Sequence, residues 1–325
     1  MSVRHLVAKS ILLALSFVLA PAALAADAFP SKPIQVIIPT KPGGGTDITG
    51  RTLAEEAGKI LGQKVVIVNK PGAGGSIGVS QLVQAEPDGH TIGYVWNAPL
   101  TILPHTLSVP YDTEAIVPIT QVTGGAPLVY CVASDFPAGP GMEFVEHVRA
   151  NPDKYTYGTD GVGSTVQLAG ERLFGPLGMK LRAIPFSGAG ETKKNFLGGH
   201  VDIYGGSIAP ILGNVKDGSA KCVIVTTAER NAALPDAASA GDLGLADKAT
   251  ELWRGLIGPP GLPADRVAVL QEAFAQAIRS DTFQAFIQKR GELGIGGTSE
   301  EFGQKVRAEY AGNGEIIKAM GLEKK

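Results

Sequence analysis

The chain has 325 residues, 44% of them hydrophobic, with 29 basic and 31 acidic residues and a formal net charge of −2. This length is sufficient for two domains that each bury a core of their own. The basic residues form no block along the chain, which excludes nucleic acid as an expected partner.

The first element is a secretory signal over residues 1–25. Arg4 and Lys9 precede an apolar run that is too short to cross a bilayer, and a small-x-small cleavage motif ends at Ala25. We therefore expect an exported protein that is cut after Ala25 or Ala26 and resides in the periplasm; an N-terminal membrane anchor is the alternative. Removal of the signal takes away two basic residues, so that the net charge of −2 becomes −4.

A first series of alternating strands and helices runs to about residue 122. The expected strands are 34–38, 65–68 and 91–95, and the expected helices are 48–61 and 77–85. Alternation at this spacing predicts right-handed βαβ units around a parallel sheet. Ligands of such sheets bind outside the carboxyl ends of the strands.

A second α/β series follows over residues 123–253. Its expected strands are 128–132, 155–157, 183–185, 201–204 and 221–226. Its expected helices are 143–150, 165–174, 192–197 and 208–216. This series predicts a second domain over 123–253.

The pattern changes again after Trp253. A proline-rich turn leads into an amphipathic helix, and a last helix begins at Thr298, which has capping-box spacing with Glu301. These helices bring little sheet of their own, so we expect them to cover the first domain. That domain is then discontinuous, 26–122 with 254–325, and is joined to the second domain by two crossings.

Two glycine clusters carry the strongest functional signal. Each follows an expected strand and precedes an expected helix, at 43–45 and at 72–78. Two helix N-termini then meet at one sheet edge, where free backbone N–H groups and the helix dipoles suit a small anion. The candidate ligand contacts here are Gly44, Gly45, Thr46, Asp47, Gly74, Gly75 and Ser76, with Asn97 after the third strand.

Asp47 is interpreted in two ways, because its negative charge repels a carboxylate. It is either a helix cap that points away from the ligand or a partner for a ligand ammonium group. The cluster at 72–78 also resembles a dinucleotide fingerprint, but its G-x-G-G-x-x-G spacing differs from the G-x-G-x-x-G pattern. An ordinary tight turn is the structural alternative for both clusters.

The second domain offers a counterpart to these loops. Ser164 and Thr165 begin a helix behind a Gly-x-Gly turn, where they either contact ligand or only cap the helix. Gly188 and Ala189 follow the next strand and are expected to form the far wall. Asp202 is expected at the end of a strand, where it either anchors a polar group of the ligand or only holds the hinge.

Catalytic and metal motifs are missing from the sequence. The five His residues form no H-x-x-x-H or Cys/His set, and there is no G-x-S-x-G elbow. We therefore expect no metal, no cofactor and no enzymatic activity.

Eight ordered stretches make the chain resemble the extracytoplasmic solute receptors of tripartite tricarboxylate transporters, the Bug family. They are 29–34 (FPSKPI), 39–47 (PTKPGGGTD), 68–75 (VNKPGAGG), 85–91 (AEPDGHT), 161–171 (GVGSTVQLAGE), 185–190 (PFSGAG), 197–202 (LGGHVD) and 253–263 (WRGLIGPPGLP). The resemblance covers almost the entire mature chain. Thr40, a further candidate contact, stands where many members of the family carry an aromatic residue.

The resemblance implies a type II periplasmic-binding-protein fold, in which two α/β domains close over a small organic carboxylate. It implies a monomeric receptor that delivers its ligand to the permease subunits of a tripartite transporter, or reports it to a sensor. An exported hydrolase or isomerase acting on a small carboxylate on the same scaffold is the alternative, because fold does not fix function.

The two cysteines, Cys131 and Cys222, are expected to form a disulfide. The compartment is oxidising, and the two residues lie on the first and last strands of the second domain, which this fold places side by side and antiparallel. Two buried free thiols are the alternative, because a register shift of one residue turns a side chain to the other face.

Overall fold

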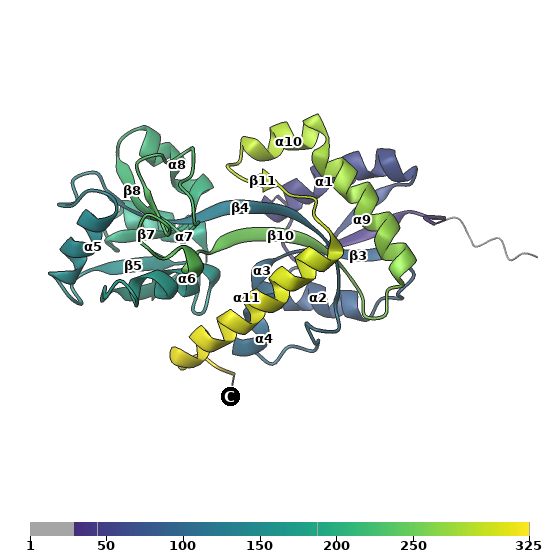
Figure 1. Ribbon diagram of the computed structural model, residues 1–325, viewed down its shortest axis with the longest axis horizontal. Coiled ribbons are helices and arrows are strands. Elements are labelled where there is room, and N and C mark those ends of the chain that lie inside the picture. Colours follow the sequence, from purple (N-terminus) through teal and green to yellow (C-terminus); the bar gives the residue numbers. More distant parts are fainter. Residues whose placement is uncertain (1–28, 44, 187, 325) are drawn as a thin grey trace, which may run out of the picture.

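The computed structural model describes residues 29–43, 45–186 and 188–324; the expected signal lies outside them. Two lobes lie side by side, and two strands, β4 (Val117–Ala133) and β10 (Glu251–Gly258), run between them (Figure 1). Because β4 and β10 are antiparallel neighbours, the chain enters the second lobe along one and returns along the other. No helix in this described part is long and apolar enough to cross a bilayer.

The first lobe is built on a sheet with the order β2-β1-β3-β10-β4. Its other strands are β1 (Ile34–Ile38), β2 (Val65–Asn69), β3 (Thr91–Trp96) and the short β11 (Leu293–Gly294), which pairs with β4. Strands β1, β2 and β3 are parallel, whereas β10 is antiparallel to β3. The β-branched run of β1 suits a central strand, and both its end residues are fully buried.

Helices cover both faces of this sheet. They are α1 (Gly45–Leu61), α2 (Ser76–Val83), α3 (Asn97–Thr101), α4 (Leu103–Thr106), α9 (Ala264–Arg279), α10 (Asp281–Gln288) and α11 (Ser299–Ala319), with a 3-10 turn, η2, over Ala73–Gly75. Helix α9 lies along α1, and Phe274 shares one hydrophobic cluster with Leu53 and Tyr94. On the other face, Phe302 of α11 packs with Trp253. The expected capping box of Thr298 is present.

The second lobe has the same layered arrangement. Its strands are β5 (Thr156–Thr159), β6 (Arg182–Pro185), β7 (Ile203–Ser207), β8 (Ala220–Val225) and β9 (Ala238–Ser239). Its helices are α5 (Met142–Arg149), α6 (Thr165–Phe174), α7 (Ala189–Leu197) and α8 (Ile208–Lys216), with a 3-10 turn, η3, over Ala246–Lys248. Helices α5 and α6 pack on one hydrophobic cluster, and α7 and α8 pack on another. The mixed α/β class expected from the sequence is therefore confirmed.

Strand direction determines which sheet edges face each other. β4 runs from the first lobe into the second, and β7 is antiparallel to it, so β7 and its parallel neighbour β5 end toward the first lobe. β3 is antiparallel to β10, so β1, β2 and β3 end toward the second lobe. The carboxyl ends of both parallel strand sets therefore point at the junction of the lobes, where the fold places a ligand.

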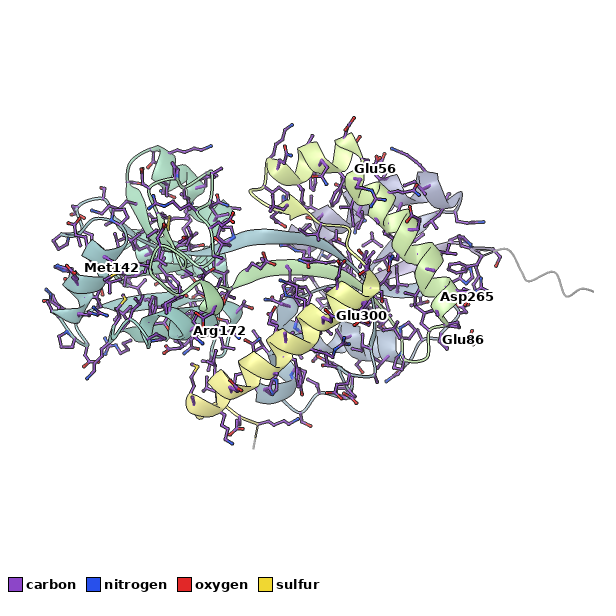
Figure 2. All side chains as sticks on the ribbon, in the orientation of Figure 1. Glu56, Glu86, Met142, Arg172, Asp265 and Glu300 are labelled. Carbon is purple, nitrogen blue, oxygen red and sulfur yellow. A yellow bond between two sulfur atoms is a disulfide. The ribbon has the colours of Figure 1, made fainter. Side chains whose placement is uncertain are left out.

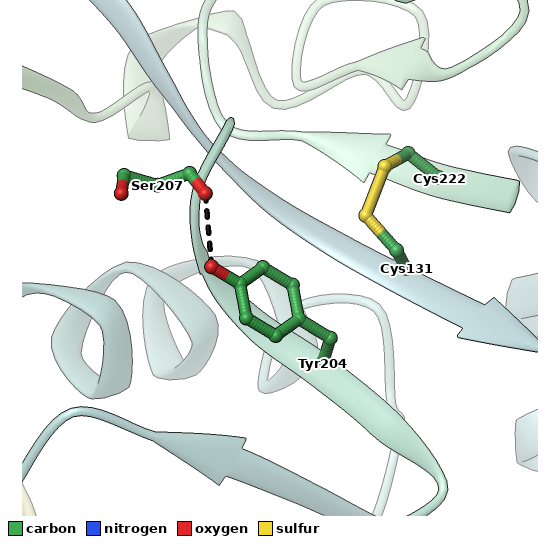
Figure 3. Close-up of a disulfide and its surroundings, with 4 residues drawn as sticks. All are labelled: Cys131, Tyr204, Ser207 and Cys222. Atoms are coloured by element: carbon green, nitrogen blue, oxygen red, sulfur yellow. Dashed lines mark hydrogen bonds between the residues drawn. A yellow bond between two sulfur atoms is a disulfide. The ribbon is translucent and has the colours of Figure 1, made fainter. Parts of the chain in front are cut away.

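A disulfide joins β4 to β8 in the second lobe. Cys131 and Cys222 are directly paired in the antiparallel register, both are buried, and their sulfur atoms lie 2.05 Å apart (Figure 3). This is the pairing expected from the sequence.

Several elements differ from the sequence-based expectation: β4 begins at Val117, and α3, α4, α10, β9, β10 and β11 were not expected. β10 is a full strand, although Arg254 and two glycines interrupt its apolar pattern. Helix α10 was not expected; it begins at Ser280, whose hydroxyl accepts a hydrogen bond from the backbone N–H of Phe283. Pairing between strands distant in sequence therefore overrides the local pattern in β10.

Candidate functional site

The first glycine loop is held in place by Asp47. One carboxylate oxygen accepts hydrogen bonds from the Gly43 backbone N–H at 2.8 Å and the Arg51 guanidinium at 3.0 Å. The other accepts from Arg51 and from the Asn69 amide, at 2.9 and 2.8 Å. Asn69 also donates to the backbone carbonyl of Thr40 at 3.1 Å, which ties the end of β2 to this loop.

These contacts choose between the two interpretations of Asp47. The Arg51 hydrogen bond is the main cause that lowers the Asp47 pKa to about 2, with further lowering by Gly43 and Asn69. Both oxygens are engaged by protein donors and the side chain is 3% exposed, so Asp47 shapes the loop rather than offering a site for a ligand ammonium group. Gly44, the centre of the loop, lies outside the described residues.

A buried ion pair lies directly behind this loop. Arg254 of β10 donates from Nε to the Thr46 hydroxyl at 3.1 Å and from Nη1 to Glu292 at 2.5 Å, and both charged side chains are less than a tenth exposed. The predicted contact Thr46 thus has its hydroxyl turned toward Arg254. Sequence reasoning missed this ion pair; the available signal was a single arginine inside the apolar run of 252–257.

Arg290 brings a second guanidinium to the same place. A Cβ at Gly45, the first residue of α1, would lie 3.2 Å from Arg290 Nη2 and 3.5 Å from Arg254 Nη2. Glycine at this position therefore lets the start of the helix approach both arginines closely. Arg290 also escaped sequence analysis, because only the folded chain brings residue 290 beside residue 45.

The second glycine loop is packed against the end of β3. Gly72, Gly74 and Gly75 have positive φ, which explains the glycines without invoking a ligand. A Cβ at Gly75 would lie 2.8 Å from Pro99 and 2.9 Å from Trp96, so this glycine is required by packing. Ser76 then begins α2 and is buried.

Asn97 lies in the interior of the first lobe. Its amide nitrogen donates to Glu309 of α11 at 2.9 Å and to the Glu251 carbonyl at 3.4 Å, while its Oδ1 is buried with no hydrogen-bond partner. The Glu309 carboxylate also accepts from Trp253 and Thr101, and burial raises its pKa. The amide nitrogen of Asn97 is thus committed to holding α11 against the sheet.

The second lobe places Ser164 and Thr165 as predicted, at the start of α6. The Ser164 hydroxyl caps the helix by accepting from the Gln167 backbone N–H at 3.3 Å. Next to this turn, Asp160 at the end of β5 has one buried oxygen without a hydrogen-bond partner, and burial raises its pKa. Gly188 and Ala189 begin α7 after β6, on the same edge.

The prediction for Asp202 is wrong in its placement. Asp202 does not end a strand but precedes β7, because the turn at 198–202 delays the strand to Ile203. Its carboxylate accepts from the backbone N–H and hydroxyl of Thr156 at 2.7 and 2.8 Å, at the start of β5. Asp202 therefore lies at the sheet edge that faces away from the first lobe.

A cavity of about 850 Å³ opens at the junction of the lobes, between the loop after β8 and the segment that joins α10 to β11. Glu292 lines this cavity, but none of the residues predicted to bind a ligand does. Within the described ranges, no group of three His, Cys, Asp or Glu side chains is arranged to hold a metal ion. The glycine loops and the starts of α6 and α7 lie on facing edges of the two lobes and remain the candidate site expected from the sequence.

Comparison with known proteins identifies similar chains. The family model described as tripartite tricarboxylate transporter family receptor matches residues 49–322. A UPF0065 protein of Cupriavidus necator is 31% identical, over 99% of this chain and 98% of the relative.

Solved structures of similar fold agree with the family match. A TctC solute-binding protein from Polaromonas superposes with a TM-score of 0.79 at 27% identity, covering 90% of this chain and 99% of that one. MatC from Rhodopseudomonas palustris, solved with bound malate, gives a TM-score of 0.73 at 26% identity, covering 89% of this chain and all of the other (100%). These proteins are solute receptors, so the alternative of an exported enzyme finds no support.

Proposed function

Because the chain belongs to the receptor family of tripartite tricarboxylate transporters, we propose that its two lobes close on a small organic carboxylate at the two glycine loops. The observation that carries this proposal is the set of hydrogen bonds to Asp47, one local and one from β2, which shape the first loop beside the end of β2. Asp47 binds both Gly43 and Asn69, so the start of α1 and the end of β2 are held together. Backbone N–H groups at α1 and α2 then supply donors for one carboxylate group.

The opposing half of the site comes from the second lobe. The starts of α6 and α7, at Thr165 and Ala189, supply further donors once the lobes approach. Ligand contacts to both lobes stabilise the closed form, which makes closure a population shift driven by the ligand. We place the domain boundaries at the crossings, with 26–122 and 254–325 in one domain and 123–253 in the other.

We expect Gly45, Gly74, Gly75 and Ser76 to contact the ligand from the first lobe, with Gly44 expected there from the sequence alone. Ser164, Thr165, Gly188 and Ala189 are expected to contact it from the second lobe. Thr40, Thr46 and Asp47 support the first loop from behind.

The partner follows from the family. The closed, ligand-bound monomer docks on the permease subunits of a tripartite transporter in the bacterial inner membrane, after export and removal of the signal beyond Ala25 or Ala26. A periplasmic sensor domain is the second candidate partner.

A thermal-shift panel of carboxylates, sugars and amines tests the ligand class. A ligand that binds the folded state stabilises it by mass action, by about 2.7 kcal/mol at a ligand concentration of about one hundred times Kd. This stabilisation raises the melting temperature. We expect carboxylates, with malate as a first candidate because MatC holds it, to raise the melting temperature. Stabilisation by sugars or amines alone contradicts the proposed ligand class.

A further inference from the structure

Arg290 shares its acidic neighbour, Glu292, with a second arginine, Arg254. Glu292, its neighbour in sequence, is bound tightly by Arg254 at 2.5 Å, whereas its distance to the Arg290 Nε is 3.9 Å. That Nε atom is buried without a hydrogen-bond partner. Glu292 is thus shared by two arginines, and the group Arg254, Arg290 and Glu292 carries one net positive charge beside the first glycine loop. Asp47 is already paired with Arg51 and does not offset that charge.

The surroundings of Arg290 hold its guanidinium in place. The Phe286 ring lies 5.5 Å from the guanidinium carbon, a cation–π contact within α10 and the turn that follows it. The side chain is 27% exposed, so it is held against Phe286 and still partly accessible to solvent.

The next residue places this charge at the junction of the lobes. A Cβ at Gly291 would lie 3.8 Å from the side chain of Ile208, the first residue of α8 in the second lobe. Three consecutive residues therefore face three different partners: Arg290 the loop at Gly45, Gly291 the second lobe, and Glu292 the crossing strand β10.

We propose that Arg290 is a specificity-determining residue that recognises a second negative charge on the ligand. This inference rests on the proposed function, since it assumes that the glycine loops hold the first carboxylate. One carboxylate is then bound by neutral backbone donors and the other by a guanidinium, which pairs with carboxylates through charge-assisted hydrogen bonds. The buried Glu292–Arg254 pair keeps the turn at 290–292 in position.

Matched pairs of acids test the proposal. Malate and 3-hydroxybutyrate differ in one carboxylate, as do succinate and butyrate, and calorimetry with each gives a dicarboxylate-to-monocarboxylate affinity ratio. In wild type this ratio is expected to be about tenfold or more, the worth of one hydrogen bond to a charged group. The variant Arg290→Gln is expected to remove most of this preference, with monocarboxylate affinity held within about twofold.

Two further variants make the result specific. Arg290→Lys keeps the charge and is expected to retain part of the preference, especially at low salt, where charge attraction is least screened. Arg279→Gln removes an exposed arginine of α9, 57% exposed and 3.7 Å from Glu272, and is expected to leave both affinities unchanged. The melting temperature of each ligand-free variant verifies that the fold is intact.

Two outcomes overturn the inference. If Arg290→Gln weakens monocarboxylates and dicarboxylates equally, or changes neither, Arg290 does not recognise the second charge. If no acid of any matched pair binds even to wild type, the proposed function itself falls, and with it the role of Arg290. The first failure leaves carboxylate binding standing and the second removes it, so the two are distinguishable.

Discussion

At the scale of single residues, Asp47 determines how the first loop is shaped. We expect Asp47→Asn to lower the free energy of unfolding at neutral pH by about 2–3 kcal/mol, because the carboxylate loses charge-assisted hydrogen bonds to Arg51 and Gly43. Folding lowers the Asp47 pKa from 3.8 to about 2, so its contribution is complete above pH 3.8 and is lost as the pH falls through 2. Denaturant unfolding at several pH values measures this difference.

The control for that prediction is Asp247→Asn. Asp247 is 71% exposed and pairs only with the adjacent Lys248, so its removal is expected to change stability by less than about 0.5 kcal/mol. Equal losses in both variants, or a difference that grows as the pH falls, contradict the assigned role of Asp47.

Gly75 gives a second residue-scale prediction. We expect Gly75→Ala to destabilise the protein by more than about 1 kcal/mol, because φ is +105° and the added Cβ would meet Pro99 and Trp96 below 3.0 Å. Gly213→Ala is the matched control: it lies in α8 with open space around it, and is expected to stabilise by up to about 1 kcal/mol. Thermal melting of both variants without ligand measures the contrast.

At the scale of elements, the disulfide between β4 and β8 closes a loop with a sequence separation of 91. In the chain-entropy model it stabilises the protein by up to about 4.6 kcal/mol. Titration of denatured, unreduced protein is expected to find no free thiol, and two thiols per chain contradict the bond. The double variant Cys131→Ala, Cys222→Ala is expected to melt at a lower temperature than the oxidised protein.

Element-scale comparison shows where sequence reasoning worked. The apolar runs and their turn residues located β1, β2, β3 and most helices, because local pattern and tertiary environment agree there. The run at β10 contains Arg254, a charged residue that the local pattern disfavours in a buried strand. Its charge is paired with Glu292, 38 residues later, and its Nε donates to Thr46. Glycine clusters likewise located the loops, but only the folded chain brings Arg254 and Arg290 beside the first of them.

At the scale of the whole molecule, β4 and β10 join the two lobes and are the expected hinge. We expect a saturating carboxylate to lower the radius of gyration in small-angle scattering, because ligand contacts on both lobes favour closure. Arg172 of α6, labelled in Figure 2, donates a hydrogen bond to Asn313 of α11 at 2.9 Å, so one direct hydrogen bond already joins the two lobes. An unchanged curve at saturation contradicts ligand-driven closure.

Because the first lobe is built from two separate parts of the chain, it also determines the order in which the two lobes can fold. The two main hydrophobic clusters of the second lobe consist of residues between 128 and 249, whereas the first lobe joins Ile34 to Ile278 and Ile287 in one cluster. Contacts between residues so distant in sequence form slowly, because the chain must first close a long loop. A chain that is synthesised from its N-terminus can therefore fold its second lobe before the last helices, α9 to α11, are available to complete the first lobe that carries both glycine loops. The capacity to hold a ligand is then the last property that the folding chain acquires.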